Sequence, residues 1–330
     1  MASQEMVGQE MASLEMAAMT GGVDFCVLSY NRLDDLKRCL AGVEQAMSEG
    51  DRVIVVDNGS TDGSREYLAG YAARNPVCTV VETTENLGVA GGRNAAYRLV
   101  RGEFLINLDD DSIPPPDIVA RTREAFARFP KAGVIAYRIV HPETGDVQND
   151  NGPHAVEVGN FHGAGYAIDR RTLQSIGLLD ETCWFAAEEI EYSIRLRRAG
   201  STVMFVPEIV VLHNSRRRTG EHRLKTERMW AYNFSRVSFA YFPLKTAFVF
   251  VMRQFGIEIP LGWRRGGVAH WLRLLKAMVS GAIDGRRSHV ALPPDVLAFY
   301  LSPDTRPDVG NVPFRTKLAQ RLAKAFPRAA

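Results

Sequence analysis

An apolar run that ends in three carboxylates and then three prolines constrains this chain more than any other stretch. Residues 104–116 read FLINLDDDSIPPP. The run is short and apolar and is followed by residues that break regular structure, which predicts a buried β-strand. Proline has no backbone N–H to donate to a sheet, so the strand must end near Asp111. The three acids therefore lie at the carboxyl edge of a strand, where open α/β sheets bind ligands.

These adjacent carboxylates need positive partners, because like charges this close repel one another. Carboxylate oxygens are hard ligands that suit Mg²⁺ or Mn²⁺, usually with substrate phosphates completing the coordination. The simpler alternative is a solvated acidic turn in which an aspartate caps the next helix. The DDD run alone leaves both interpretations open, so the rest of the chain has to decide between them.

Strand and helix patterns alternate along the chain before and after this run. Such alternation predicts an α/β fold with a mostly parallel, Rossmann-like sheet sandwiched by helices. Residues 141–159 are rich in Pro, Gly, Asn and Asp, which predicts an irregular loop. The expected strands are 23–30, 52–57, 78–81, 104–109, 133–139 and 202–207, with an apolar run from 210, and the expected helices include 34–47, 64–73 and 117–129.

Four motifs follow one another along the first part of the chain: SYNR at 29–32, VDNGSTD at 56–62, NLGVAGGRN at 86–94 and LDDD at 108–111. Together they resemble the nucleotide-sugar half of family 2 glycosyltransferases, in their rhamnosyltransferase-like branch. The resemblance implies a GT-A-type catalytic domain over 23–215, with a nucleotide-sugar half at 23–115 and an acceptor half at 116–215. The remaining parts are a disordered leader at 1–22 and a basic, aromatic-rich helical C-terminal region at 216–330.

The resemblance implies roles on the donor side. Asp57 would accept hydrogen bonds from the nucleobase, Arg93 would pair with the diphosphate at a helix start, and Gly163 would leave room for the sugar. The residues alone allow simpler roles, since Asp57 could close an Asx turn and Arg93 could lie in solvent. The expected nucleotide-sugar-binding residues are Tyr30, Asn31, Arg32, Asp57, Asn86, Gly88, Arg93, Asp109, Asp110 and Gly163.

The same resemblance implies a metal site. Asp109 and Asp111 match the family's DxD pair, which holds Mg²⁺ or Mn²⁺ on the diphosphate. His213 follows an apolar run, and in relatives a histidine here approaches the metal or the diphosphate. A lone histidine in such a place is as often structural, so Asp109, Asp111 and His213 are the expected ligands with that alternative open.

Residues 184–200, WFAAEEIEYSIRLRRAG, predict a loop that enters an amphipathic helix. Glu188 and Glu189 lie near its start, where the helix dipole favours carboxylates. The family usually has Glu-Asp here, and its second acid is the general base. Glu189 takes that place with one extra methylene, so Glu189 and Glu188 are the expected catalytic residues. The alternative is a charged, solvated helix.

The resemblance implies an inverting, metal-dependent glycosyltransferase. It would move a sugar from a UDP- or dTDP-type donor to the hydroxyl of a carbohydrate, a lipid-linked glycan or a small molecule. Two alternatives remain: a sugar-1-phosphate nucleotidyltransferase and a non-catalytic nucleotide-sugar-binding protein. A dinucleotide oxidoreductase is disfavoured because no GxGxxG follows the first strand.

Charge is distributed unevenly between the two parts of the chain. Residues 1–210 carry 19 Lys and Arg against 31 Asp and Glu, whereas residues 211–330 carry 21 against 7. The basic C-terminal part predicts contact with something anionic. It could pack on the catalytic domain or lie peripherally on a membrane, since no uncharged stretch reaches the roughly 20 residues of a spanning helix. No nucleic-acid module is recognisable, and a homo-oligomer is open.

The chain ends and the cysteines bear on location. Residues 1–22 repeat MASxEM and lack a basic start, so they do not resemble a signal peptide. The four cysteines show no CxxC spacing, which favours a reduced compartment over a disulfide framework or a zinc site. We therefore expect a cytoplasmic protein, with the inner membrane face as an alternative.

Overall fold

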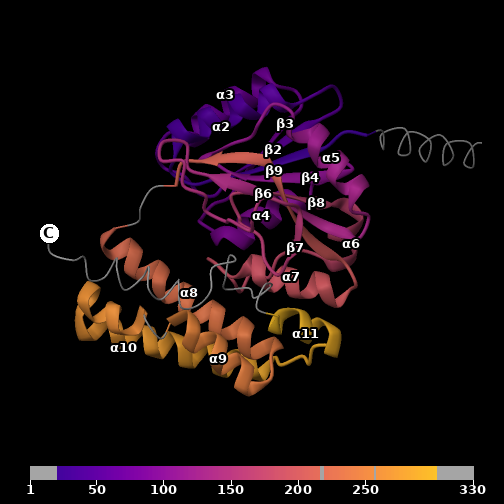
Figure 1. The fold of residues 1–330 in the computed structure, drawn as a ribbon. Helices are drawn as coiled ribbons and strands as arrows, with labels where there is room; N and C mark the ends of the chain where they lie inside the picture. The colour runs from indigo at the N-terminus through magenta and orange to yellow at the C-terminus, as the bar shows by residue number, and fades with distance from the viewer. Residues whose placement is uncertain (1–20, 216–218, 256–257, 303–330) are drawn as a thin grey trace, which may run out of the picture.

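The structure, a computed structural model, describes residues 21–215, 219–255 and 258–302 (Figure 1). Almost all of the predicted leader lies outside these residues. Side chains between 256 and 265 are also outside the description. Four helices that follow the catalytic domain, α8 to α11, bear out the expected helical C-terminal region.

A single mixed sheet forms the centre of the α/β part of the chain, in the order β3-β2-β1-β4-β8-β6-β9-β5, with β7 paired to β9. The first four strands run parallel, β8 runs antiparallel to both of its neighbours, and β6 and β9 are parallel. The strands are β1 (Asp24–Ser29), β2 (Arg52–Asp57), β3 (Cys78–Glu82), β4 (Phe104–Asp109), β5 (Ser112–Ile113), β6 (Ala132–Val140), β7 (Val156–Val158), β8 (Gly165–Asp169) and β9 (Thr202–His213).

Helices cover both faces of this sheet, because strand side chains alternate between the two faces. In β1, Phe25 and Val27 face a core shared with α2 (Leu33–Ala46), α3 (Ser64–Arg74) and α5 (Ile118–Arg128). Cys26, on the other face, belongs to a core with α4 (Gly88–Tyr97), α6 (Arg170–Ile176) and α7 (Glu188–Arg198). The result is the predicted layered α/β architecture.

Strand β9 is longer than the expected strand 202–207, because it also includes the apolar run from 210. It runs unbroken through Pro207, and its pairing with β6 shifts register between Tyr137–Val206 and Arg138–Val210. Pro207 has no N–H for the ladder, so the strand bulges there instead of ending. The segment 141–159 was also expected to be an irregular loop throughout, but it contains β7, which pairs with β9.

The C-terminal helices form a second helical layer below the catalytic domain (Figure 1). They are α8 (Gly220–Tyr241), α9 (Leu244–Phe255), α10 (Glu258–Arg287, broken at Gly267) and α11 (Pro294–Leu301). Their core includes Phe234, Phe250 and Tyr300, and it extends into Ile190 and Ile194 of α7. Helix α7 therefore packs against the sheet with one face and against the C-terminal helices with the other.

Candidate functional site

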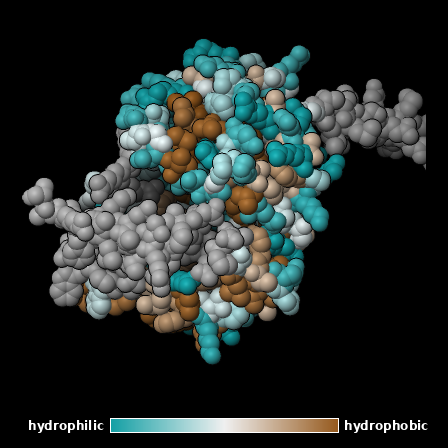
Figure 2. Space-filling model, in the orientation of Figure 1, coloured by the Kyte–Doolittle hydropathy of each residue, from teal (hydrophilic) through white to brown (hydrophobic). Residues whose placement is uncertain are grey.

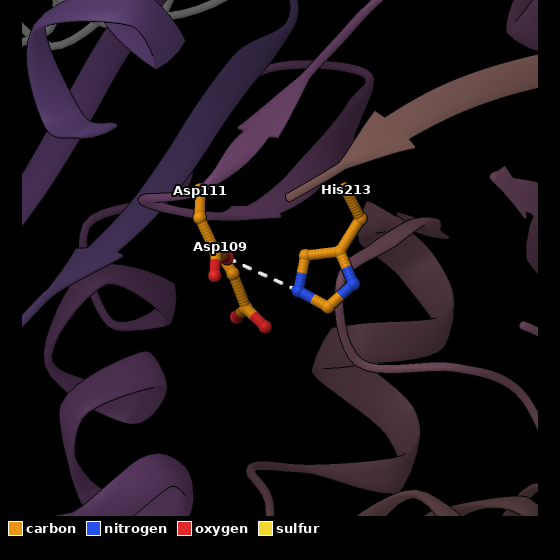
Figure 3. A group of neighbouring side chains, drawn as sticks. All are labelled: Asp109, Asp111 and His213. Atoms are coloured by element: carbon orange, nitrogen blue, oxygen red, sulfur yellow. Dashed lines mark ion pairs between the residues drawn. The ribbon is translucent and has the colours of Figure 1, made fainter. Parts of the chain in front are cut away.

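The three expected metal ligands converge at one point although they come from distant parts of the chain. Asp109 ends β4, Asp111 precedes β5, and His213 ends β9. The short strand β5 pairs with β9 and sets Ser112 opposite His213, which brings Asp111 beside the imidazole. One ligand atom from each residue lies within 4.8 Å of the others. Figure 3 shows the three side chains pointing into the same space.

The hydrogen bonds around these side chains fit a divalent cation. The buried Oδ1 atom of Asp111 faces Nε2 of His213 at 3.1 Å. The other ring nitrogen, Nδ1, bonds Oε1 of Gln148 at 2.7 Å. Such a partner holds Nδ1 protonated and leaves Nε2 free to ligate, as in metal sites where a second residue orients the histidine. Two carboxylates and one imidazole could therefore hold Mg²⁺ or Mn²⁺.

Burial and neighbouring charges control the ionisation of Asp111 and His213. Burial opposes ionisation of Asp111, but the hydrogen bond and charge of His213, together with Arg32, hold its pKa below the usual value. Burial likewise disfavours the protonated form of His213. The hydrogen bond with Asp111 and the charge of Asp111 outweigh this effect of burial, so the pKa of His213 is raised. The Asp111 carboxylate is thus kept in the form that binds a cation.

Residues of the turn after β1 contact Asp110 and Asp111. The Arg32 guanidinium contacts the Asp111 carboxylate, and its Nη1 lies 3.7 Å from Oδ1 of Asp110. The backbone N–H of Tyr30 donates to Oδ2 of Asp110 at 3.1 Å, while the Tyr30 ring is exposed. In the structure Arg32 therefore neutralises the acids directly, and its expected contact with the donor stays a prediction.

Asp110 is buried and faces the protein more than the site, and burial raises its pKa to about 8. The folded protein then keeps this proton up to about pH 8, whereas an unfolded chain releases it at about pH 4. The folded state binds more protons between these values, so the Asp110 contribution to stability falls as the pH rises through this window.

Asp110→Asn is therefore expected to flatten the loss of stability in mildly alkaline solution. Asparagine cannot ionise, so the variant should lose less free energy of unfolding than the wild type between about pH 5 and about pH 9. Urea unfolding in metal-free buffer measures this, with Asp117→Asn, an exposed partner of Arg121, as the control. Parallel pH curves for the wild type and Asp110→Asn would show that Asp110 is ionised throughout.

Arg93 lies at the centre of the site and joins the acids of both halves. Its Nη2 atom donates to Oδ1 of Asp109 at 3.0 Å and to the carbonyl of Gly163 at 2.9 Å. Its Nη1 atom lies 3.1 Å from Oε1 of Glu189 and 3.4 Å from Oε1 of Glu188. The guanidinium is buried, so it serves as the internal partner of these acidic groups, and its expected contact with the diphosphate stays a prediction.

The two glutamates at the start of α7 have different environments. The side chain of Glu188 is 2% exposed and that of Glu189 is 15% exposed. Burial and the charge of Glu189 raise the pKa of Glu188 well above its usual value, so Glu188 is held neutral. Of the two, Glu189 is the carboxylate that can face a substrate.

Two glycines lie close to the segment that carries these glutamates. A Cβ atom on Gly163 would lie 2.3 Å from Oε1 of Glu189, so a larger residue there would displace the Glu189 carboxylate. Gly88 has a φ of 76°, and a Cβ on it would meet the carbonyl of Trp184 at 2.2 Å, so this position requires glycine. The room that Gly163 is expected to leave for the sugar stays a prediction.

Two alanines before α7 adopt left-handed backbone conformations, with φ of 67° at Ala186 and 72° at Ala187. Such strained positions persist where the surroundings hold them. Asn233 of α8 does so by donating to the carbonyls of Phe185, at 2.9 Å, and Ala186, at 3.2 Å. The C-terminal helices therefore support the loop that delivers Glu188 and Glu189.

The remaining residues expected to bind the donor form hydrogen bonds within and between the loops that follow β1, β2 and β3. Asp57 is fully buried and accepts from Nη2 of Arg65 at 3.1 Å and from the N–H of Ser60 at 3.2 Å. Asn31 accepts from the N–H of Thr61 at 2.7 Å, and Oδ1 of Asn86 accepts from the N–H of Gly88 at 2.8 Å. These residues meet at one edge of the sheet as expected, and their contacts with a nucleotide sugar stay predictions.

Sequence reasoning missed Gln148, Asn233 and His162 as members of the site. His162 contacts the His213 ring, and burial, with His213 beside it, lowers its pKa to about 4. Gln148 and Asn233 lie in segments without a recognisable motif, so no local signal marks them. The His-Gly run at 162–163 was a usable signal for His162 because it adjoins Gly163.

A comparison with models of protein families shows the family of the chain. The model of glycosyl transferase family 2 matches residues 24–194, about half of the chain. The chain belongs to glycosyl transferase family 2. This membership confirms the predicted family and the prediction of a glycosyltransferase.

Curated relatives of this family 2 chain differ in how much of their length it covers. It is 24% identical over 246 residues to N-acetylglucosaminyl-diphospho-decaprenol L-rhamnosyltransferase of Mycobacterium tuberculosis, which covers 61% of this chain and 79% of the relative. It is 38% identical over 94 residues to the uncharacterized glycosyltransferase YfnE of Bacillus subtilis, which is 28% of this chain and 24% of that relative.

Solved structures support the same fold for this family 2 protein. The mannosyltransferase PcManGT of Pyrobaculum calidifontis, in complex with GDP-Man and Mn²⁺, aligns with a TM-score of 0.54 at 20% identity over 93% of this chain and 81% of that one. Residues 1–349 of TarS from S. aureus, in complex with UDP-GlcNAc, align with a TM-score of 0.58 at 16% identity over 83% and 82% of the two chains. The predicted GT-A fold is thereby confirmed.

Proposed function

We propose that this protein is an inverting, metal-dependent glycosyltransferase that uses Asp109, Asp111 and His213 as metal ligands and Glu189 as the general base. The observation that carries the proposal is that Arg93 contacts both Asp109 and Glu189, at 3.0 and 3.1 Å. The acid of the donor half and the acid of the acceptor half therefore open onto one site.

The roles of the protein groups follow from their exposure and charge. Glu189 takes the proton from an acceptor hydroxyl as that oxygen attacks the anomeric carbon. Neutral Glu188 behind it removes one of the charges that would otherwise repel Glu189. Asp109, Asp111 and His213 would hold a divalent cation, which would neutralise negative charge on the departing diphosphate. No side chain needs to act as a nucleophile, so a single displacement inverts the sugar.

Donor and acceptor are proposed by chemical class. The donor is a nucleoside-diphosphate sugar of the UDP or dTDP type, and two of the structures similar to this chain contain UDP-GlcNAc or GDP-Man. The acceptor is a carbohydrate or a lipid-linked glycan, since one relative is named for a decaprenol-linked substrate. The four free cysteines, three of them buried, are compatible with work in the cytoplasm.

A panel of nucleotide sugars with candidate acceptors tests this proposal. We expect nucleoside diphosphate to be released with Mn²⁺ and an acceptor, and release to stop in a chelator. Release of pyrophosphate from a nucleoside triphosphate and a sugar phosphate would identify a nucleotidyltransferase instead. Donor binding without any turnover across the panel would favour a silent binding protein.

Asp111→Asn is expected to abolish the stabilisation of the folded protein by Mn²⁺. The variant loses one ligand charge and the anionic partner of His213, so Mn²⁺ should no longer raise the melting temperature. Thermal unfolding with and without Mn²⁺ measures this, and Asp117→Asn serves as the control on an exposed acid outside the cluster. An unchanged Mn²⁺ effect in Asp111→Asn would remove Asp111 from the ligands.

A further inference from the structure

Helix α9 is apolar on both of its faces. Ala247, Phe250, Val251 and Phe255 are buried in the core of the C-terminal helices. The opposite face is also apolar, because Leu244 is 59% exposed and Phe248 is 58% exposed, with Val249 and Met252 beside them. A helix that is hydrophobic all round is normally covered on every side. An exposed apolar face of this kind marks an interaction site.

Helix α10 continues this exposed apolar surface. Val268, Leu272, Val279 and Ile283 are exposed and recur at helical spacing on one face, opposite the buried Leu274 and Met278. Figure 1 shows α9 and α10 together at the lower edge of the molecule, with α8 between them and the sheet. Figure 2 shows brown and tan surface at parts of the lower side of the molecule.

The charges on the two helices are almost all positive. Within the described side chains of α9 and α10 the acidic residue is Asp284, which pairs with Tyr232 and Arg287. Lys276 lies between Leu272 and Val279, so a cation stands inside the apolar stripe. Among the described side chains, the basic residues of these two helices are Lys245, Arg253, Arg273, Lys276, Arg286 and Arg287.

We propose that the outer face of α9 and α10 docks on an anionic membrane surface, with its apolar side chains in the headgroup region and its cations on lipid phosphates. This combination is what holds an interfacial helix at a bilayer. A second copy of the chain fits less well, because a symmetric contact would set two like-charged faces against each other. Within the described residues no helix is long and apolar enough to cross the bilayer.

Docking on a membrane would bring a lipid-linked acceptor to the protein, and this link rests on the proposed function. The α8 helix links the site and this surface, since its Asn233 holds the loop before Glu189 while its helix packs on α10. The docking surface itself is independent of the reaction, so it is tested without activity.

Cosedimentation with lipid vesicles tests the surface. We expect the protein to bind vesicles of phosphatidylcholine mixed with phosphatidylglycerol, to bind phosphatidylcholine vesicles much less, and to be released by salt. Leu244→Ser with Phe248→Ser removes apolar contact, and Arg273→Glu with Lys276→Glu reverses charge. Each pair should weaken binding by about tenfold or more.

A matched control pair separates the surface from general effects. Val77→Ser with Leu99→Ser changes two exposed apolar residues of the catalytic domain and should leave vesicle binding unchanged. Melting temperatures of all variants show whether they are folded. Three results would each overturn the proposal: no binding to the anionic vesicles, equal binding by wild type and both surface variants, or a dimer in solution that Leu244→Ser with Phe248→Ser dissociates.

Discussion

Glu189→Gln is expected to lower turnover by about 10²- to 10⁴-fold, the range that a positioned general base contributes. Glutamine keeps the size of the side chain and can still contact Arg93, but it cannot accept a proton from the acceptor hydroxyl. Donor affinity should change little, because Asp109, Asp111 and the donor loops are untouched. Steady-state transfer assays and calorimetric titration with the donor measure the two quantities separately.

The matched control for this substitution is Glu103→Gln. Glu103 is an exposed glutamate that pairs with Arg123 at the opposite end of β4 from Asp109. It should show wild-type turnover. If Glu189→Gln also turns over at the wild-type rate, the base is another residue and the proposed role of Glu189 is wrong. If donor binding is lost together with turnover, Glu189 shapes the donor site.

Arg93→Met is expected to lower the free energy of unfolding by about 3–5 kcal/mol, the effect of leaving buried charges without their partner. Methionine fills much of the same space but leaves Asp109 and Glu189 without a cation and Glu188 without its hydrogen-bond donor. Urea unfolding of the wild type and the variant measures the loss.

Arg98→Met provides the comparison one turn further along the chain. Arg98 also pairs with a glutamate, Glu181, at 2.8 Å, but both side chains are about half exposed. Surface pairs of this kind contribute about 0–1 kcal/mol, so this variant should be nearly as stable as the wild type. Equal losses in the two variants would mean that the Arg93 cluster does not stabilise the fold as its burial suggests.

Most of the framework could be predicted because it depends on local patterns. The apolar run before Asp109 and the prolines after Asp111 predict where β4 ends, and the strand does end at Asp109. The alternation of strands and helices predicts a layered fold. The same reasoning failed at β9, where pairing with β6 overrode the break that Pro207 suggests.

The sequence by itself determined which edge of the sheet carries the acids, since the carboxyl ends of parallel strands meet at one edge. Only the tertiary structure decided which cation each acid meets. Arg93 is buried among Asp109, Glu188 and Glu189, because acidic groups removed from water need a positive or hydrogen-bonding partner. Its expected contact with the diphosphate stays a prediction. Such partners lie far apart in the chain, so no spacing rule identifies them. The same holds for Asn233, which hydrogen-bonds the loop before Glu189 from a helix outside the sequence motifs.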